Sequence, residues 1–206
     1  MLSIVMLLVI TVTLKAQDIV VIKHTNYTTH FSKSKRYPVL VEWETTKAMV
    51  GCPTPLKRKD NFKPDPQLVD ETNIAFYYLK SGYDRGHVMP AADNLCQTQA
   101  IQDECFYFSN MVAQTHRLNA GDWKSLETAT RNWALISSKV RVWSGSVGEA
   151  KKIGLVSVPT QCWKVVQVAG KWHAYLFNND LSNPDGFQNN EVPLAQIEKL
   201  TGFKFK

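Results

Sequence analysis

Hydrophobic and polar residues alternate over several short stretches of this 206-residue chain. Residues 18–32 and 37–46 are rich in Val, Ile, Thr and aromatic side chains with partial alternation, a pattern typical of β-strands. A hairpin turn is expected at residues 168–171, where Ala and Gly separate two apolar runs. Further strands are predicted at 105–114, 140–148, 153–159, 162–170 and 172–179.

Residues 119–140 have a helical period instead. Trp123, Leu126, Thr130, Trp133 and Ala134 recur at helical spacing and would form one core-facing stripe. Together with the strands, this helix predicts an α+β fold, in which a mostly antiparallel central sheet is flanked by helices.

The N-terminus has a different pattern. An apolar run from residue 2 to 14 is followed by Lys15, Ala16 and Gln17. The run is too short to span a bilayer and is typical of a signal peptide, with Ala16 as the residue before cleavage. We therefore predict a signal peptide at 1–16, a single domain at 17–206, and a secreted or periplasmic protein without stable membrane association. The alternative is a buried N-terminal strand.

Composition adds little to this picture except for charge. Hydrophobic residues make up 44% and charged residues 20%, so the chain is typical of a folded globular protein. The net charge of +6 is compatible with a polyanionic partner but does not establish one. Residues 51–70 contain four prolines and a cluster of Lys and Arg. This predicted loop either is solvated or lies along a phosphate backbone.

The four cysteines, Cys52, Cys96, Cys105 and Cys162, have no C-x-x-C spacing, which argues against a structural zinc site. An even number in an exported protein favours disulfides. Sequence alone leaves all three pairings open. The local expectation is Cys96 with Cys105, which leaves Cys52 with Cys162. Without export, four free thiols become the better interpretation.

Chemically active side chains are concentrated in the stretch YDRGHVMPAADN, residues 83–94. Hydrolysis of a phosphodiester needs a base to deprotonate water and positive charge to stabilise the phosphate oxygens. A neutral His87 suits the first task, and Arg85 suits the second. Gly86 between them allows a tight turn or a close approach of the backbone. A divalent metal ion would neutralise the leaving oxygen.

A second group of polar residues lies in the predicted helix. Asn119 is at its start, within the arc of the apolar stripe, and Glu127 and Arg131 are one turn apart on a common face. Each has a simpler explanation: Asn119 as a helix N-cap, Glu127 and Arg131 as a surface salt bridge, and His87 as a structural histidine. The functional interpretation depends on the combination.

The two groups together resemble a known family. DRGHVMPAAD resembles the signature of the DNA/RNA non-specific endonucleases, which include endonuclease G and secreted bacterial nucleases with a His-Me finger, or ββα-metal, site. FSNMVAQTHRLNAGDWKSLE resembles the second block of that family, Ser-Asn-x-x-Pro-Gln followed by Asn-x-x-x-Trp-x-x-Leu-Glu. Later segments, VPTQCWKVV and AYLFNN, extend the resemblance from about residue 37 to 179.

The resemblance implies a role for each matching residue. His87 is similar to the general base that activates water. Asn119 matches the side chain that binds the metal, and Glu127 matches a carboxylate that holds metal-bound water. Arg85 and Arg131 match arginines that contact the phosphate.

Other matches concern support and substrate binding. Asp84 is similar to an acid that orients the signature segment, and Asn110 matches a residue that shapes the site around the base. Arg58, with Lys57 as an alternative, resembles an upstream arginine that binds substrate. Two residues depart from the family pattern: Ala113 replaces a proline, and Met89 replaces a commoner alanine.

The first hypothesis is thus a secreted nuclease that cuts DNA and RNA to 5′-phosphate products. The resemblance implies Mg²⁺ as cofactor, with Mn²⁺ as an alternative, and leaves a homodimer open. Two other hypotheses are a phosphodiesterase acting on small nucleotides and a catalytically silent nucleic-acid-binding module.

Overall fold

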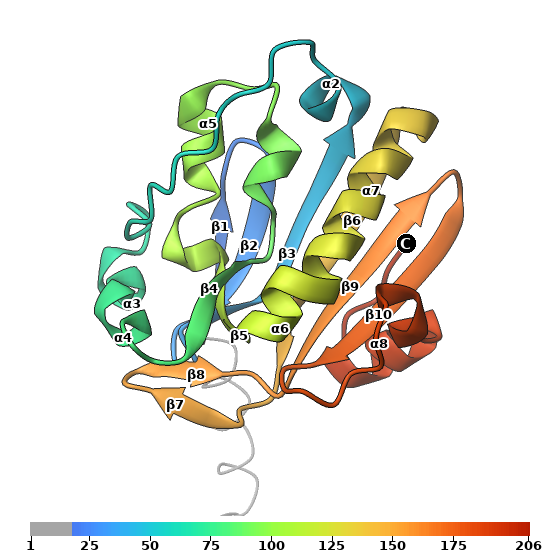
Figure 1. The fold of residues 1–206 in the computed structure, drawn as a ribbon. Coiled ribbons are helices and arrows are strands. Elements are labelled where there is room, and N and C mark those ends of the chain that lie inside the picture. The colour runs from blue at the N-terminus through green and yellow to red at the C-terminus, as the bar shows by residue number, and fades with distance from the viewer. Residues whose placement is uncertain (1–17) are drawn as a thin grey trace, which may run out of the picture.

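A six-stranded antiparallel sheet forms the centre of the computed structural model, which describes residues 18–206 (Figure 1). The spatial order is β1-β2-β3-β6-β9-β10. The predicted signal peptide at 1–16 and its alternative, a buried strand, lie outside the described residues. The strands are β1 (Ile19–Lys23), β2 (Tyr27–Ser32), β3 (Tyr37–Thr46), β6 (Lys139–Val147), β9 (Gln161–Val168) and β10 (Lys171–Asn178).

Helices cover both faces of this sheet. The longest, α7 (Lys124–Ser137), lies across one face, and α8 (Leu194–Thr201) packs on the other near the C-terminus (Figure 1). The predicted α+β class is confirmed. The shorter helices are α2 (Lys47–Val50), α3 (Val69–Thr72), α4 (Ala75–Tyr78), α5 (Gln99–Glu104) and α6 (His116–Leu118).

Both faces of the central strands are buried, which explains why the sequence alternates only in part. In β3, Val41 belongs to the core beneath α7, whereas Leu40 belongs to the core beneath α8. Val166 and Val165 of β9 divide in the same way. Neighbouring residues of a strand point to opposite faces, so a sheet covered twice needs apolar residues at both.

Two small sheets flank the central one. β4 (Tyr83–His87) pairs antiparallel with β5 (Met111–Thr115), and β7 (Lys151–Ile153) pairs with β8 (Val156–Val158). The prediction of one strand over 105–114 was wrong in its first half. Phe106 lies in a turn and Phe108 begins a short 3-10 helix, Phe108–Asn110. Both rings are buried, and the Phe108 amide donates to the carbonyl of Lys63. The stretch 153–159 is likewise part of a hairpin rather than one strand.

The predicted helix is shorter than residues 119–140. A π-helical turn, Asn119–Trp123, precedes α7, and Ser138 ends it with a φ of 72° before β6 begins. The core-facing stripe is confirmed: Trp123, Leu126, Thr130 and Ala134 are buried, and Trp133 is partly buried.

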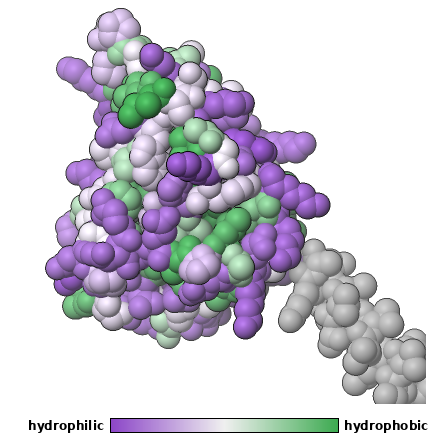
Figure 2. All heavy atoms as spheres, turned by 90° about the vertical axis from the view of Figure 1, so that its right-hand side faces the viewer, coloured by the Kyte–Doolittle hydropathy of each residue, from purple (hydrophilic) through white to green (hydrophobic). Residues whose placement is uncertain are grey.

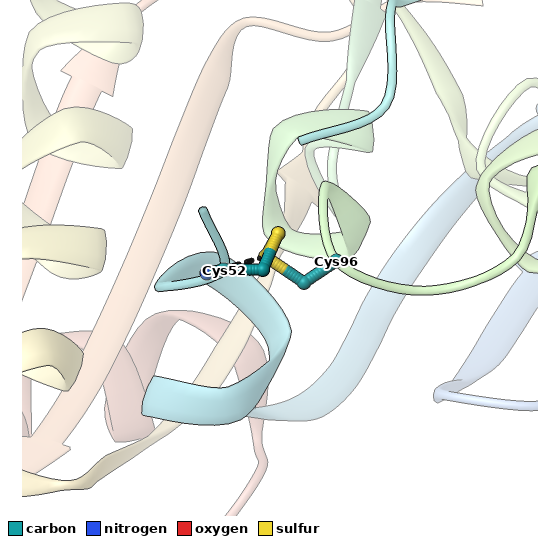
Figure 3. The surroundings of a disulfide bond; sticks show 2 residues. All are labelled: Cys52 and Cys96. Atoms are coloured by element: carbon teal, nitrogen blue, oxygen red, sulfur yellow. Dashed lines mark hydrogen bonds between the residues drawn. A yellow bond between two sulfur atoms is a disulfide. The ribbon is translucent and has the colours of Figure 1, made fainter. Parts of the chain in front are cut away.

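The cysteine pairing expected from sequence was wrong. A disulfide joins Cys52, just after α2, to Cys96 (Figure 3). The Cys96 amide donates to the carbonyl of Met49. Cys105 and Cys162 are buried free thiols. Cys105 faces Met89 in the core, with their sulfur atoms 3.8 Å apart. The pairing is therefore decided by the contact between α2 and the segment after β4, which sequence spacing does not reveal.

The surface seen from the β10 side is mostly hydrophilic, with apolar side chains in small groups (Figure 2). No helix within residues 18–206 is long and apolar enough to cross a membrane.

The pairing predicts the outcome of thiol labelling. Denatured but unreduced protein should expose two alkylatable thiols, Cys105 and Cys162, and peptide mapping should recover Cys52 linked to Cys96. A linked Cys96–Cys105 peptide, or four labelled thiols, would contradict the structure.

Candidate active site

Two adjoining cavities lie where β4 meets the start of α7. Their volumes are about 350 and about 290 Å³. Arg58, Arg85 and Asn119 line both, so the cavities meet along these three residues. His87, Glu127 and Arg131 line the second cavity. The structure therefore brings together the residues that sequence placed in two separate blocks.

His87 ends β4 and is almost completely enclosed. It is 8% exposed, and the rings of Phe106 and Phe62 lie 4.8 and 5.5 Å from its ring. Its carbonyl accepts a hydrogen bond of 3.0 Å from Trp123 Nε1, which ties β4 to the turn before α7. Its Nε2 atom is buried and has no hydrogen-bond partner within residues 18–206.

Burial lowers the pKa of His87 to about 3, and the positive charges of Arg58 and Arg85 act in the same direction, while Asp60 opposes them. An imidazole with so low a pKa is neutral throughout the neutral pH range. His87 is therefore held as a hydrogen-bond acceptor, the form that a general base needs.

Gly86 is required by a close approach rather than by a tight turn. A Cβ atom there would lie 2.0 Å from Oε1 of Gln114, whose side chain is buried. A larger residue would force the buried side chain of Gln114, on the paired strand β5, to move.

Asn110 holds the chain just beyond His87. Its Oδ1 accepts from the Met89 amide at 2.9 Å, and its Nδ2 donates to the carbonyls of Met89 and Cys105 at 2.9 and 2.8 Å. Its own carbonyl accepts from the Val88 amide at 3.0 Å. This buried side chain thus satisfies backbone groups that leave the sheet at the end of β4.

Asp84 connects to Asn119 rather than to His87. Asp84 Oδ2 accepts from Asn119 Nδ2 at 2.9 Å and lies 2.8 Å from Nδ1 of the exposed His116. Because a carboxylate can only accept, this bond fixes Nδ2 as the donor and leaves the Oδ1 oxygen of Asn119 for another ligand.

Arg85 and Arg58 lie on aromatic faces at the mouth of the cavities. The Arg85 guanidinium is 3.9 Å from the centre of the Phe62 ring, and that of Arg58 is 5.2 Å from the centre of the Phe106 ring. Arg58 also bonds Asp60 at 2.6 Å on the exposed loop 51–68. Stacking on a ring face leaves the planar N–H edge able to bind an oxyanion.

Glu127 and Arg131 do not form the surface salt bridge considered from sequence. Glu127, with 13% of its side chain exposed, lies 3.9 Å from Nζ of Lys164. Arg131 instead pairs with Asp93, at 3.3 Å. Burial raises the pKa of Glu127 to about 7, while Lys164 and Arg131 act against that rise.

Sequence reasoning missed Lys164 and Asp93. Both have a signal in the sequence: Lys164 is a lone charge inside the apolar strand CWKVV, and Asp93 follows the apolar run after His87. A charge in a buried strand is rarely tolerated without a partner. Only the fold shows that those partners are Glu127 and Arg131.

No group of three or more His, Cys, Asp or Glu side chains suited to a metal occurs within residues 18–206. The amide oxygen of Asn119, which lines both cavities, is of the kind that Mg²⁺ accepts as a ligand while it keeps several waters.

Comparison with known proteins places this arrangement in a family. The model of the DNA/RNA non-specific endonuclease family matches residues 8–206. The chain belongs to this family. A nuclease from Nostoc sp. is 30% identical over 87% of the chain and 70% of its own length. The zebrafish mitochondrial nuclease EXOG is 36% identical over 88% of the chain.

A solved structure agrees with this membership. The crystal structure of the EndoG/EndoGI complex contains a chain that superposes with a TM-score of 0.77 at 28% identity, covering 90% of this chain and 84% of that chain. Two of the relatives are considerably longer than this chain. The chain spans 59% of zebrafish EXOG and 57% of Xenopus laevis EXOG.

The two departures from the DNA/RNA non-specific endonuclease pattern are accommodated by packing. Ala113 lies in β5, and its carbonyl accepts from Asn179 Nδ2 at 2.8 Å. Oδ1 of the same Asn179 accepts from the Thr115 amide at 2.9 Å, so one side chain holds this strand end at two points. Met89 is buried against Cys105.

Glu127 predicts a pH dependence of stability. Its folded pKa of about 7 lies above the usual 4.5, so its stabilising contribution is complete below 4.5 and is lost as pH rises through 7. In Glu127→Gln this loss should be absent. The difference in unfolding free energy between wild type and variant, from urea titrations, should therefore change between these pH values and level off above them. A difference that is constant with pH would show that Glu127 does not titrate in this range.

Proposed function

We propose that the chain is a metal-dependent nuclease that hydrolyses phosphodiester bonds of DNA and RNA with little sequence selectivity. One observation carries the proposal: a buried, neutral His87 lines the same cavity as Asn119, Glu127 and Arg131. Membership in the family supports the same substrate class.

His87 is the proposed general base. Its depressed pKa keeps the imidazole neutral, so one ring nitrogen can take a proton from a water molecule in the cavity that His87 lines. The proton of that water passes to the unprotonated ring nitrogen of His87 as its oxygen attacks phosphorus, and the bond from phosphorus to the leaving oxygen breaks.

Asn119 is the proposed metal-binding side chain. Asp84 binds its Nδ2 and so directs the Oδ1 oxygen to a cation, and Glu127 lines the same cavity, where it would accept hydrogen bonds from water around that ion. A bound Mg²⁺ or Mn²⁺ supplies positive charge to the phosphate and the leaving oxygen.

Arg85, Arg131 and Arg58 are the proposed phosphate contacts. Arg85 and Arg58 line both cavities, and their stacking on Phe62 and Phe106 fixes where each guanidinium lies. Contacts to phosphate carry no sequence information, which accounts for the expected lack of base selectivity. They are contacts between opposite charges, so binding should weaken as the salt concentration rises.

A secreted or periplasmic location is the remaining part of the proposal. The Cys52–Cys96 disulfide is typical of an oxidising compartment and supports a secreted or periplasmic protein. The EXOG relatives are named mitochondrial nucleases, so the family itself does not decide the compartment. Dimer formation stays a prediction from the resemblance.

Removal of the base tests the reaction. His87→Ala should fold normally and lose a factor of roughly 10² to 10⁴ in the rate of plasmid and RNA digestion with Mg²⁺. The matched control is His173→Ala, on β10, where the imidazole pairs with Glu191 outside both cavities. Full activity in His87→Ala would assign the base elsewhere. Cleavage of a small phosphodiester but of no polynucleotide by wild type would favour the phosphodiesterase alternative.

Removal of the proposed metal ligand has a separate readout. Asn119→Ala should shift the Mg²⁺ dependence of cleavage to higher concentration and lower the maximal rate, because the ion loses its one proposed side-chain oxygen. Isothermal titration calorimetry with Mg²⁺ should show the same weakening without substrate. The control is Asn189→Ala, an exposed asparagine outside the cavities. A Mg²⁺ titration unchanged by Asn119→Ala would place the ligand elsewhere.

A further inference from the structure

Lys164 is a charged residue in the core beneath α7. It lies in β9 on the face that α7 covers, and its side chain is 1% exposed. Its ammonium is 4.1 Å from the centre of the Trp123 ring and 5.8 Å from that of Trp43. Burial lowers the pKa of Lys164, whereas the charges of Glu127 and Asp93 oppose that shift. Two aromatic faces stabilise the cation, but they do not neutralise it.

The carboxylate that compensates this charge belongs to the candidate site. Among the residues described, Lys164 forms its ion pair with Glu127, at 3.9 Å. Glu127 lines the cavity, whereas Lys164 does not. Lys164 therefore does not touch substrate in the cavity, and Glu127 is the charged cavity residue with which it forms an ion pair.

Stability alone does not explain this pair. Replacing a buried ion pair by apolar side chains of similar size is often neutral or stabilising, since desolvation offsets the attraction of the charges. The pair instead links Lys164, at the centre of the sheet, to Glu127, at the wall of the polar cavity. It can therefore hold the Glu127 carboxylate at a defined position and favour its charged state.

Arg131 cannot take over the role of Lys164. Its guanidinium is paired with Asp93, which also accepts from Trp43 Nε1 at 2.9 Å and from Thr45 Oγ1 at 2.6 Å. This second carboxylate is thus anchored to β3 and keeps Arg131 beside it. Two cations and two carboxylates balance one another beneath and beside the cavity.

We propose that Lys164 is a positioning residue of this site, whose buried ammonium keeps the Glu127 carboxylate charged and fixed at the wall of the cavity. The proposal rests on the proposed nuclease function. The charged groups that face Glu127 are Lys164 from β9, Arg131 from α7, Asp93 from the turn after β4, and Arg58 from the loop 51–68.

The direction of the effect follows from these charges. Burial already raises the pKa of Glu127 to about 7 against the opposing charge of Lys164. Without this cation the pKa rises further, so Glu127 is protonated at neutral pH and becomes charged only in more alkaline solution. His87 is neutral over the same range and does not produce this change.

The test compares Lys164→Met, Lys164→Arg, Glu127→Gln and the double variant Lys164→Met/Glu127→Gln over a range of pH. We expect Lys164→Met to move the acidic limb of the profile upward by about one pH unit, a tenfold change in the proton equilibrium, and so to lower kcat/KM about fivefold at pH 7 and about tenfold well below it. Lys164→Arg keeps the positive charge and should retain most of the wild-type pH profile. The double variant should be no less active than Glu127→Gln, because Lys164 acts only through that carboxylate.

Two results would overturn the proposal. One is a loss in Lys164→Met that is the same at every pH, with a double variant much less active than Glu127→Gln, which would show a structural role alone. The other is an unchanged profile. Lys171→Met, which removes an exposed lysine at the β9–β10 turn, is the matched control and should leave the profile as in wild type. Lys164→Gln serves as the neutral variant if Lys164→Met fails to fold.

A readout independent of cleavage separates this proposal from the nuclease assignment. The infrared band of the protonated Glu127 carboxyl group, identified as the difference between each protein and its Glu127→Gln counterpart, should titrate at higher pH in Lys164→Met than in wild type. If wild type digests no nucleic acid but this shift is present, the proposed function fails and the control of Glu127 by Lys164 stands. If digestion occurs and the band does not move, Lys164 does not set the charge of Glu127.

Discussion

The packing of α7 against the central sheet is the contact on which the site depends. Trp123, Leu126 and Ala134 are buried on one stripe of the helix, and their burial fixes how it is turned about its axis. The indole N–H of Trp123 then bonds the carbonyl of His87, which ties the start of the helix to the end of β4. A helix rotated by one residue would turn Glu127 and Arg131 about 100° away from the cavity.

Burial has opposite consequences for the two titratable groups of the site. Desolvation favours the neutral form of each, so it keeps His87 unprotonated and ready to accept, but it also tends to protonate Glu127. Neighbouring cations further disfavour protonation of His87 and oppose protonation of Glu127. Arg58 and Arg85 disfavour a charged His87, and Lys164 and Arg131 favour a charged Glu127.

Much of this arrangement rests on side chains that do no chemistry themselves. Asn110 holds the backbone beyond His87, Asn179 holds the end of β5, and Asp84 orients Asn119. Each satisfies polar groups at a place where regular hydrogen bonding of the sheet stops. The reactive residues can therefore stand at strand and helix ends, open to a cavity, and still be fixed in position.

The sequence by itself determined the α+β class, the apolar stripe of α7 and the family, because period and motif order are local properties of the chain. It also identified His87, Asn119 and Glu127 as candidates, since their spacing within two short blocks is visible without a fold. It did not predict β4 as a strand, because Asp84, Arg85 and Gly86 lack the β-branched pattern that marks one, and pairing with β5 overrides that deficit. The disulfide partner of Cys96, the ion pair of Glu127 with Lys164 and the pairing of Arg131 with Asp93 were decided only by tertiary structure. Each joins residues 37 or more positions apart, and which of several chemically equivalent partners is met depends on how the elements pack.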